Sequence, residues 1–218
     1  MNKPADIAIK LTTPFGVASY PKLNSPDEYK GKKQYKVKLI LDGNDPKVQE
    51  FADRVRMKSE EFHQIKMAEA KPKPGKPKPK FDVYQPIQVE YAADGETPTG
   101  RLILQAKMNA SYTDKQGVEV ELRPAIFDSL NQAVDTTKII IRGGSEMRLS
   151  VKLIPFANEA SNVAGGTFQL QQVQVRKFAQ GGGGGQSAFD AVEGDDSSQF
   201  GSDDSEAPAP AASGDDEF

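Results

Sequence analysis

The chain has 218 residues and contains no cysteine, no tryptophan and one histidine, His63. Without cysteine the protein has no disulfides, no thiolate zinc sites and no cysteine nucleophile. We expect the lone histidine to be a solvated side chain on a helix, which leaves no serine or threonine with the partner that a catalytic triad requires. Gly143 and Gly144 are not followed by the Lys-Ser/Thr of a phosphate-binding loop, so a turn is expected there. These absences argue against an enzyme.

The sequence also lacks a long apolar run. No window approaches the roughly 18 apolar residues of a membrane span, and residues 1–14 lack the apolar core of a signal peptide. We therefore expect a soluble intracellular protein without a membrane partner. A carboxylate-only metal site stays an alternative, but the spacing of its four candidates gives no sign of one, so no metal or other cofactor is predicted. The candidates are Asp82, Asp94, Asp114 and Asp128.

Positive and negative charges are unevenly distributed along the chain. The formal net charge is −3, which by itself argues against a nucleic-acid partner. Ten acidic residues and no lysine or arginine follow Gly185, which leaves 21 acidic against 28 basic residues in the first 185. A basic segment joined to an acidic one is typical of a nucleic-acid-binding domain with an interaction tail.

The glycine tract at residues 181–185 marks the predicted domain boundary. The residues after it are too polar to offset the chain entropy lost on folding. We therefore predict a binding domain at residues 1–180, followed by a flexible glycine linker and a disordered acidic tail at residues 181–218. The end of the tail suits a partner pocket with a basic rim and an apolar floor, and consists of Asp215, Asp216, Glu217 and Phe218. Its charge also lets the tethered tail compete with a nucleic acid for a basic surface.

Apolar and polar residues alternate in several stretches, which indicates strands with one buried face. The clearest are residues 34–41, 101–112 and 147–153. Residues 113–117 are expected to form a hairpin turn, and a change of phase at Gln171 and Gln172 indicates a bulge.

One amphipathic helix is predicted from Asp45, as N-cap, to Ala70, with Pro46 in its first turn. Many strands with a single long helix do not fit a parallel fold in which helices alternate with strands. The pattern favours a mostly β fold, namely a five-stranded OB-type barrel with additional strands and one long capping α-helix.

The outward faces of the predicted strands are basic, with Glu146 as almost the only outward acid. This clustering favours a shared binding surface over isolated solubilising charges. The cations are Lys36, Lys38, Arg101, Lys107, Arg148 and Lys152. Single-stranded nucleic acid also needs aromatic platforms for its unstacked bases. Tyr112 at a hairpin and Phe156, expected to precede a loop, are candidates, with core packing as the alternative for each; Tyr35 is expected in the core.

Lysine and proline alternate in residues 71–80. Proline and like-charge repulsion both extend the chain, so we expect an exposed basic arm. It is either a contact to nucleic-acid phosphates or a solvated linker. Its lysines are Lys71, Lys73, Lys76, Lys78 and Lys80.

Four stretches carry a family resemblance. They are Gln34-Tyr-Lys-Val-Lys-Leu with the Asp45-Pro46 helix start, Ala110-Ser-Tyr-Thr-Asp-Lys115, Ile139-Ile-Ile-Arg-Gly-Gly-Ser145 leading into residues 149–156, and the glycine tract with the terminal Asp215-Asp-Glu-Phe218. In this order they resemble the single-stranded DNA-binding proteins of tailed bacteriophages. The lysine-proline arm and Ala157-Asn158 depart from the pattern of that family.

The resemblance implies an OB fold that binds single-stranded DNA without strong sequence preference in replication, recombination and repair. It implies contacts of the tail with the phage DNA polymerase and helicase, in the cytoplasm of the infected bacterial host. It places the binding groove at or near Tyr112, Arg148, Lys152 and the loop starting at Phe156, and Arg142 in the third stretch joins the predicted set. Annealing activity and a homodimer are left open.

Three alternatives share parts of this pattern. A single-stranded RNA-binding OB protein has the same physical requirements. A protein-interaction adaptor would use the barrel for a protein partner. A metal-dependent nuclease would need the carboxylates to converge.

Overall fold

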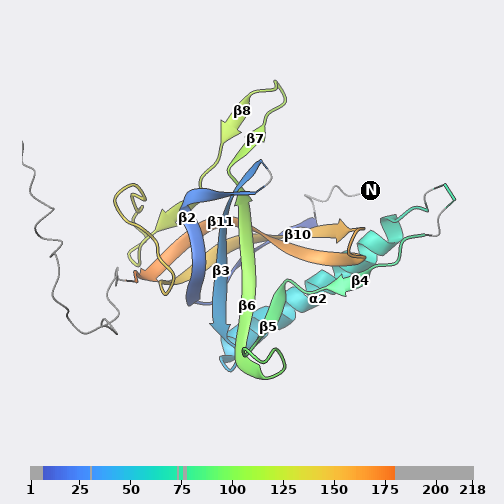
Figure 1. Cartoon of the computed structure of the whole chain (residues 1–218), viewed down its shortest axis with the longest axis horizontal. Helices are drawn as coiled ribbons and strands as arrows, with labels where there is room; N and C mark the ends of the chain where they lie inside the picture. Colours follow the sequence, from blue (N-terminus) through green and yellow to red (C-terminus); the bar gives the residue numbers. More distant parts are fainter. Residues whose placement is uncertain (1–6, 30, 73, 76–77, 180–218) are drawn as a thin grey trace, which may run out of the picture. The chain divides into compact units, whose positions relative to one another are not determined.

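The computed structural model of the protein describes residues 7–29, 31–72, 74–75 and 78–179. Its five long strands are β2 (Gly16–Tyr29), β3 (Lys32–Asp42), β6 (Pro98–Asn109), β10 (Glu146–Asn158) and β11 (Val163–Lys177). They close into a barrel in the order β2-β3-β6-β11-β10, with β10 returning to β2 (Figure 1). Neighbours are antiparallel except β6 and β11, which run parallel. This ring confirms the predicted five-stranded OB-type barrel.

Shorter strands extend the barrel sheet. β1 (Ile9–Thr12) pairs with β10, and β9 (Ala125–Phe127) runs parallel to β11. β4 (Asp82–Tyr84) also runs parallel to β11, whereas β5 (Ile87–Tyr91) pairs with β6. β7 (Ser111–Thr113) and β8 (Glu119–Glu121) form a separate hairpin that projects from the barrel (Figure 1). This hairpin confirms the turn predicted at residues 113–117.

The barrel core forms from the alternate residues of each strand, because successive side chains point to opposite faces. Fully buried side chains on these inner faces include Val37, Leu39, Leu104, Ala106, Leu149 and Leu153, and Tyr35 is buried as predicted. In the β10–β11 ladder, Val151 pairs with Leu170 and Ser150 pairs with Gln172. Gln171 therefore has no partner in this ladder, which confirms the predicted bulge.

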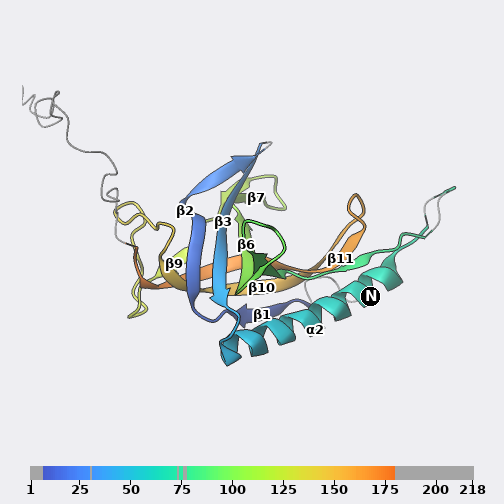
Figure 2. The same ribbon diagram turned by 60° about the horizontal axis from the view of Figure 1, so that its bottom comes forward.

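The long helix α2 (Pro46–Glu69) begins as predicted. The Asp45 carboxylate accepts a hydrogen bond from the backbone N–H of Lys47 at 2.8 Å, and Pro46 occupies the first turn. The buried residues of the helix are Val48, Phe51, Val55, Ser59 and Phe62. They pack on the core side of β10 and β11, beside which the helix runs in Figure 2.

Ser59 is the one buried polar residue of that helical face. Its hydroxyl donates to the Tyr84 carbonyl at 2.6 Å and accepts from the Gly166 N–H at 2.8 Å. The approach is close, since a Cβ on Gly165 would lie 2.4 Å from the Tyr84 carbonyl oxygen. Ser59 thus holds β4 against β11 and determines where Tyr84 lies.

His63 and three of the four candidate aspartates have structural roles. The expectation of a solvated histidine was wrong, because His63 is half-buried and its Nε2 lies 2.8 Å from the Phe81 carbonyl oxygen. Asp94, Asp114 and Asp128 each accept backbone N–H groups of their own turns. Within the described ranges, no three His, Asp or Glu residues are grouped so as to hold a metal ion.

The turn expected at Gly143 and Gly144 is present. The Ser145 N–H bonds the Arg142 carbonyl at 3.2 Å, and Gly144 has a φ of +88°, which favours glycine. In the part of the chain that the structure describes, no helix is long and apolar enough to cross a membrane.

Candidate nucleic-acid interface

Lysines on the outer face of the barrel lie next to one another across strand pairs. Lys36 on β3 is opposite Lys107 on β6, which is opposite Gln169 on β11. Gln169 is opposite Lys152 on β10, which is opposite Lys10 on β1. Directly opposed residues have Cβ atoms roughly 5 Å apart, so these side chains form one continuous line. We call these five residues the basic row; it joins three of the predicted cations and adds Lys10.

A groove opens on the same face where β6 and β11 separate, because β6 turns to pair with β5 and β11 with β4. The cavity has a volume of about 180 Å³ and is lined by Lys38, Tyr84, Pro86, Gln88, Ile103, Gln105, Lys107, Thr167 and Phe168. None of these lining residues carries a carboxylate. The lining therefore contains two ammonium groups, two amides and one phenol ring, and its only charges are positive.

Two aromatic rings lie beside the groove on either side of Gly165. Phe156 pairs with Gly165 on one side and Tyr84 pairs with it on the other. Their rings are 5.0 Å apart and meet edge to face at 82°. Phe156 shares its face of β10 with Lys152. The expected loop at Phe156 was wrong, because β10 continues to Asn158.

Tyr84 was missed in the sequence. Its strand has three residues, follows the lysine-proline arm and shows no clear alternation. The only local signal was an aromatic residue next to the basic arm, which does not identify a platform.

Arg101 lies apart from the basic row. Its Nε hydrogen-bonds the Glu90 carboxylate of β5, and Arg101 pairs in register with Asp42. It is six residues from Lys107, which corresponds to about 20 Å along a strand. The structure therefore does not bring Arg101 together with the other predicted cations.

The outer face also holds more acid than the sequence indicated. The Lys36 ammonium bonds the Asp27 carboxylate of β2 and holds the pKa of Asp27 below its usual value. Arg176 bonds Glu146 and lowers the pKa of that carboxyl. Both acids thus stay charged at neutral pH. Among the described residues no carboxylate forms an ion pair with Lys38, Lys107 or Lys152, so the unneutralised part of the face is centred on these lysines.

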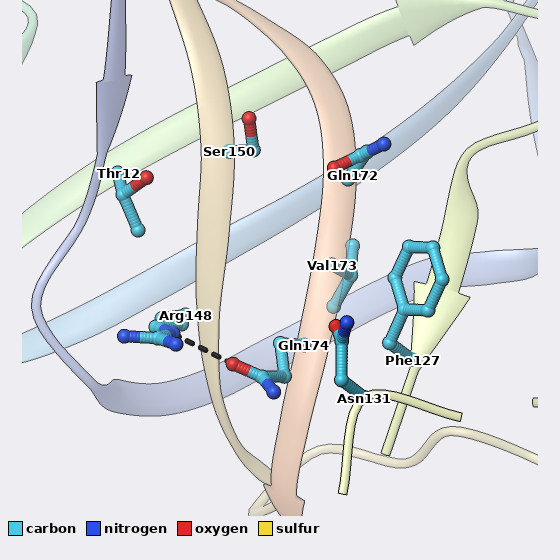
Figure 3. A pocket seen from close by; sticks show the side chains of 8 residues that line it. All are labelled: Thr12, Phe127, Asn131, Arg148, Ser150, Gln172, Val173 and Gln174. Carbon is cyan, nitrogen blue, oxygen red and sulfur yellow. Dashed lines mark hydrogen bonds between the residues drawn. The ribbon is translucent and has the colours of Figure 1, made fainter. Parts of the chain in front are cut away.

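Arg148 opens on a second pocket, at the other end of β10. Its Nε donates to Gln174 Oε1 at 2.8 Å, and its Cζ lies 5.0 Å from the centre of the Phe15 ring. The pocket has a volume of about 360 Å³, and we name it the Arg148 pocket (Figure 3). It is lined by Thr12, Phe127, Asn131, Arg148, Ser150, Gln172, Val173 and Gln174. It shares no lining residue with the groove.

Tyr112 and Arg142 lie on segments that flank the barrel strands. Tyr112, 50% exposed, is on the β7–β8 hairpin opposite Val120, and this hairpin follows the Lys107 end of β6. Arg142 is exposed in the turn before β10, where the Gly144 N–H bonds the Ala18 carbonyl.

Tyr20 on β2 is a further exposed aromatic that the sequence analysis did not select. Ser19 pairs with Lys38 and Lys22 pairs with Lys36, so β2 has one extra residue between them and forms a bulge. Tyr20 has a φ of +46° and its side chain is 85% exposed. Its neighbours Ser19 and Lys22 pair with Lys38 and Lys36, and strained backbone that exposes an aromatic ring is often found at functional surfaces.

The tail lies outside the described residues, and so does part of the basic arm. Lys71, Lys78 and Lys80 are exposed. Lys73 and Lys76 are not among the described residues, and neither are Asp215, Asp216, Glu217 and Phe218.

Sequence comparisons match this chain to proteins of one kind. The family model for the single-stranded DNA-binding protein of bacteriophage T7 matches residues 11–177. The single-stranded DNA-binding protein of Enterobacteria phage T3 is 27% identical over 164 residues, which is 73% of this chain and 68% of that protein. The protein of the same name from Escherichia phage T7 is 26% identical over 163 residues, with the same coverage.

Solved structures share the fold. The crystal structure of gp2.5, a single-stranded DNA-binding protein encoded by bacteriophage T7, superposes with a TM-score of 0.66 at 21% identity and covers 85% of this chain and 100% of that one. The single-stranded DNA-binding protein of bacteriophage Enc34 in complex with single-stranded DNA superposes with a TM-score of 0.51 at 16% identity and covers 80% and 89%. The chain therefore belongs to the family of phage T7-type single-stranded DNA-binding proteins, which are binding proteins and not enzymes.

Proposed function

We propose that this chain coats and protects single-stranded DNA without strong sequence preference during phage replication, recombination and repair, in the cytoplasm of the infected bacterial host. The observation that carries the proposal is the groove, where Lys38 and Lys107 meet the Tyr84 ring in a cavity lined by no carboxylate. Family membership supports the same conclusion.

The groove and the basic row supply both interactions that a single strand offers. Lysines replace the counterions condensed on the phosphates, and log affinity falls with log salt by about 0.7 for each phosphate contacted. Unstacked bases pack on aromatic rings, each contributing roughly 1–3 kcal/mol. In this proposal the stacking rings are Tyr84, Phe156, Tyr20 and Tyr112. Gln88 and Gln105 carry both donors and acceptors, so they accommodate any base edge.

The lysine-proline arm extends this binding surface in the proposal. Lys71, Lys78 and Lys80 are exposed, and a stiff cationic segment reaches phosphates beyond the barrel. Lys73, Lys76, Arg142, Arg148 and the other predicted cations add to the electrostatic attraction.

The acidic tail recruits replication proteins such as the phage DNA polymerase and helicase, and it competes with DNA for the groove when no partner is bound. Ten negative charges without a basic residue support both parts of this proposal. Phe218 and its carboxylate provide an apolar anchor with a charge, for which a partner needs an apolar pocket with a basic rim.

The DNA-binding proposal is tested by fluorescence anisotropy with a dT oligonucleotide, the matched rU oligonucleotide and a duplex, between about 50 and 200 mM salt. We expect the dT oligonucleotide to bind most tightly, with an affinity that falls steeply with salt. Equal binding of rU would indicate an RNA-binding protein, and an affinity that does not depend on salt would contradict the proposal. Magnesium added to the same samples should leave the labelled strands uncut.

The tail proposal is tested with two matched variants, Phe218→Ala and Phe200→Ala, which each remove one aromatic ring from the tail. We expect only Phe218→Ala to abolish binding to the purified polymerase or helicase. Equal effects of the two variants would show that the terminal ring is not an anchor. Deletion of residues 181–218 should tighten dT binding, and unchanged affinity would argue against competition.

A further inference from the structure

The Arg148 pocket lies outside the groove and is not explained by it. Four segments form it: β1, the outer faces of β10 and β11, and β9 with the turn that follows (Figure 3). Its volume of about 360 Å³ falls in the range of small-ligand sites. Arg148 is the only charged residue in its lining, so the pocket attracts anions.

The arginine is held in place before any ligand binds. Gln174 accepts from its Nε at 2.8 Å and donates from its own amide to the Asp128 carbonyl at 3.1 Å. Gln174 therefore ties Arg148 to the β9 wall, while Phe15 packs against the guanidinium. The remaining guanidinium N–H groups have no acceptor among the described residues, and a fixed guanidinium suits a phosphate.

Four polar side chains of the pocket have no hydrogen-bond partner among the described residues: Thr12, Asn131, Ser150 and Gln172. The two amides and two hydroxyls present donors and acceptors together, which suits the edge of a nucleobase. Phe127 adds a half-buried aromatic ring on the same rim.

The rim that carries Phe127 and Asn131 is itself well ordered by hydrogen bonds. The Asp128 carboxylate accepts the N–H groups of Leu130 and Gln132 at 2.9 and 2.8 Å. Asn131 has a φ of +62°, a conformation that asparagine tolerates. The aromatic ring and the amide are thus presented on a fixed turn.

We propose that the Arg148 pocket binds one nucleotide of single-stranded DNA, with the unpaired base against Phe127, its edge on Asn131 and Gln172, and a phosphate on Arg148. This site is additional to the groove and rests on the proposed function, because its ligand is the same polymer. The nucleotide belongs either to the strand that already fills the groove or to a second strand held by the same barrel.

The test uses Gln172→Glu and Asn131→Asp, which add a negative charge to the pocket with little change in size. Gln132→Glu is the matched control, since Gln132 is exposed in the same turn and does not line the pocket. All three variants should keep the thermal unfolding midpoint of the parent protein. The probes are dT oligonucleotides from about 4 to about 40 nucleotides, a range that spans the site sizes of OB folds.

The first arm measures affinity against length. The pocket variants should bind the shortest oligonucleotides normally and lose about tenfold in affinity beyond a threshold length, as expected for one stacked base or one phosphate contact. The second arm measures energy transfer between two short oligonucleotides, one with a donor and one with an acceptor dye. Loss of transfer in the pocket variants alone would assign the pocket to a second strand.

An effect confined to the pocket variants in either arm supports the site. The two arms together show whether the nucleotide belongs to the strand in the groove or to a second strand. If Gln172→Glu and Asn131→Asp match Gln132→Glu in both arms, the inference is overturned while the proposed function stands. If no oligonucleotide of the series binds even the parent protein, the proposed function falls and this inference with it.

Discussion

The two ends of β6 carry the same kind of outward side chain in different surroundings. At one end Lys107 lies between Lys36 and Gln169 and lines the groove. At the other end Arg101 is bonded to Glu90 and lies opposite Asp42. Both are exposed cations on one face of one strand. The residues that neighbouring strands bring beside each cation therefore decide whether it forms an ion pair, as Arg101 does, or lines the groove, as Lys107 does.

Reversing the charge at the Lys107 end of β6 should have the largest effect. The double variant Lys38→Glu with Lys107→Glu should lower affinity for a dT oligonucleotide by about 100-fold, because each charged contact contributes roughly 1.5–3 kcal/mol. The slope of affinity against salt should also become shallower. Titration by fluorescence anisotropy measures both quantities.

The matched control for that variant is Lys47→Glu with Lys138→Glu, which changes net charge equally at exposed positions outside the groove. Its affinity should change by less than about threefold, as expected for long-range screening alone. Similar losses in the two double variants would show that overall charge, and not the groove, controls binding.

The second prediction concerns the bulge at Tyr20 of β2. Tyr20→Gly should weaken dT binding about tenfold through the loss of one stacking ring. The same change should raise the free energy of unfolding by about 1 kcal/mol, because glycine adopts a positive φ without strain. Binding and stability should therefore move in opposite directions, which urea titration and anisotropy would reveal.

Tyr20→Phe separates the ring from the backbone strain. It should retain both the affinity and the stability of the parent protein. A Tyr20→Gly variant that binds normally would rule out Tyr20 as a platform, and one that is destabilised would contradict the assigned strain.

The third prediction concerns Asp27, whose removal would make the surface near the Lys107 end of β6 more positive. Asp27→Asn removes the partner of Lys36 and should raise dT affinity about threefold, with a salt slope steeper by about 0.7 if Lys36 then contacts one more phosphate. Asp135→Asn, at another ion-paired aspartate, is the control and should leave both quantities unchanged. An unchanged slope for Asp27→Asn would mean that Lys36 does not reach the strand.

The smallest effect is expected at the Arg101 end of β6. Arg101→Gln should change dT affinity by less than about twofold and should cost no more than about 1 kcal/mol of stability, the range for an exposed ion pair. Salt-dependent binding and urea denaturation test these values. A loss comparable to that of the groove variant would remove the distinction between the two ends of β6.

Much of the barrel could be predicted because its long strands alternate with period two. The stretches around Val37, Leu104 and Leu149 place every second side chain in the core, and Asp45-Pro46 marks the start of the helix. Such patterns are local, so they are visible in one sequence. The lysines of the outer face follow from the same alternation.

The remainder of the interface depends on contacts between distant segments. Glu90 and Asp27 neutralise cations that lie 11 and 9 residues away, and no alternation indicates either pairing. Tyr84 becomes a groove residue only because β4 joins β11 about 80 residues later. Phe127 and Asn131 meet Arg148 through the parallel β9–β11 pairing, which the sequence analysis did not foresee.

Through the hydrogen bonds of Ser59 to Gly166 and Tyr84, helix α2 sets the distance between β4 and β11. The gap between helix and strand is one hydroxyl wide, and Gly165 admits nothing larger than hydrogen. A methyl group at Gly165 would push β4 outward and change the spacing of the Tyr84 and Phe156 rings. In the proposed binding mode, a side chain at Gly165 would therefore alter base stacking on these rings, although it would point toward Ser59 of the helix.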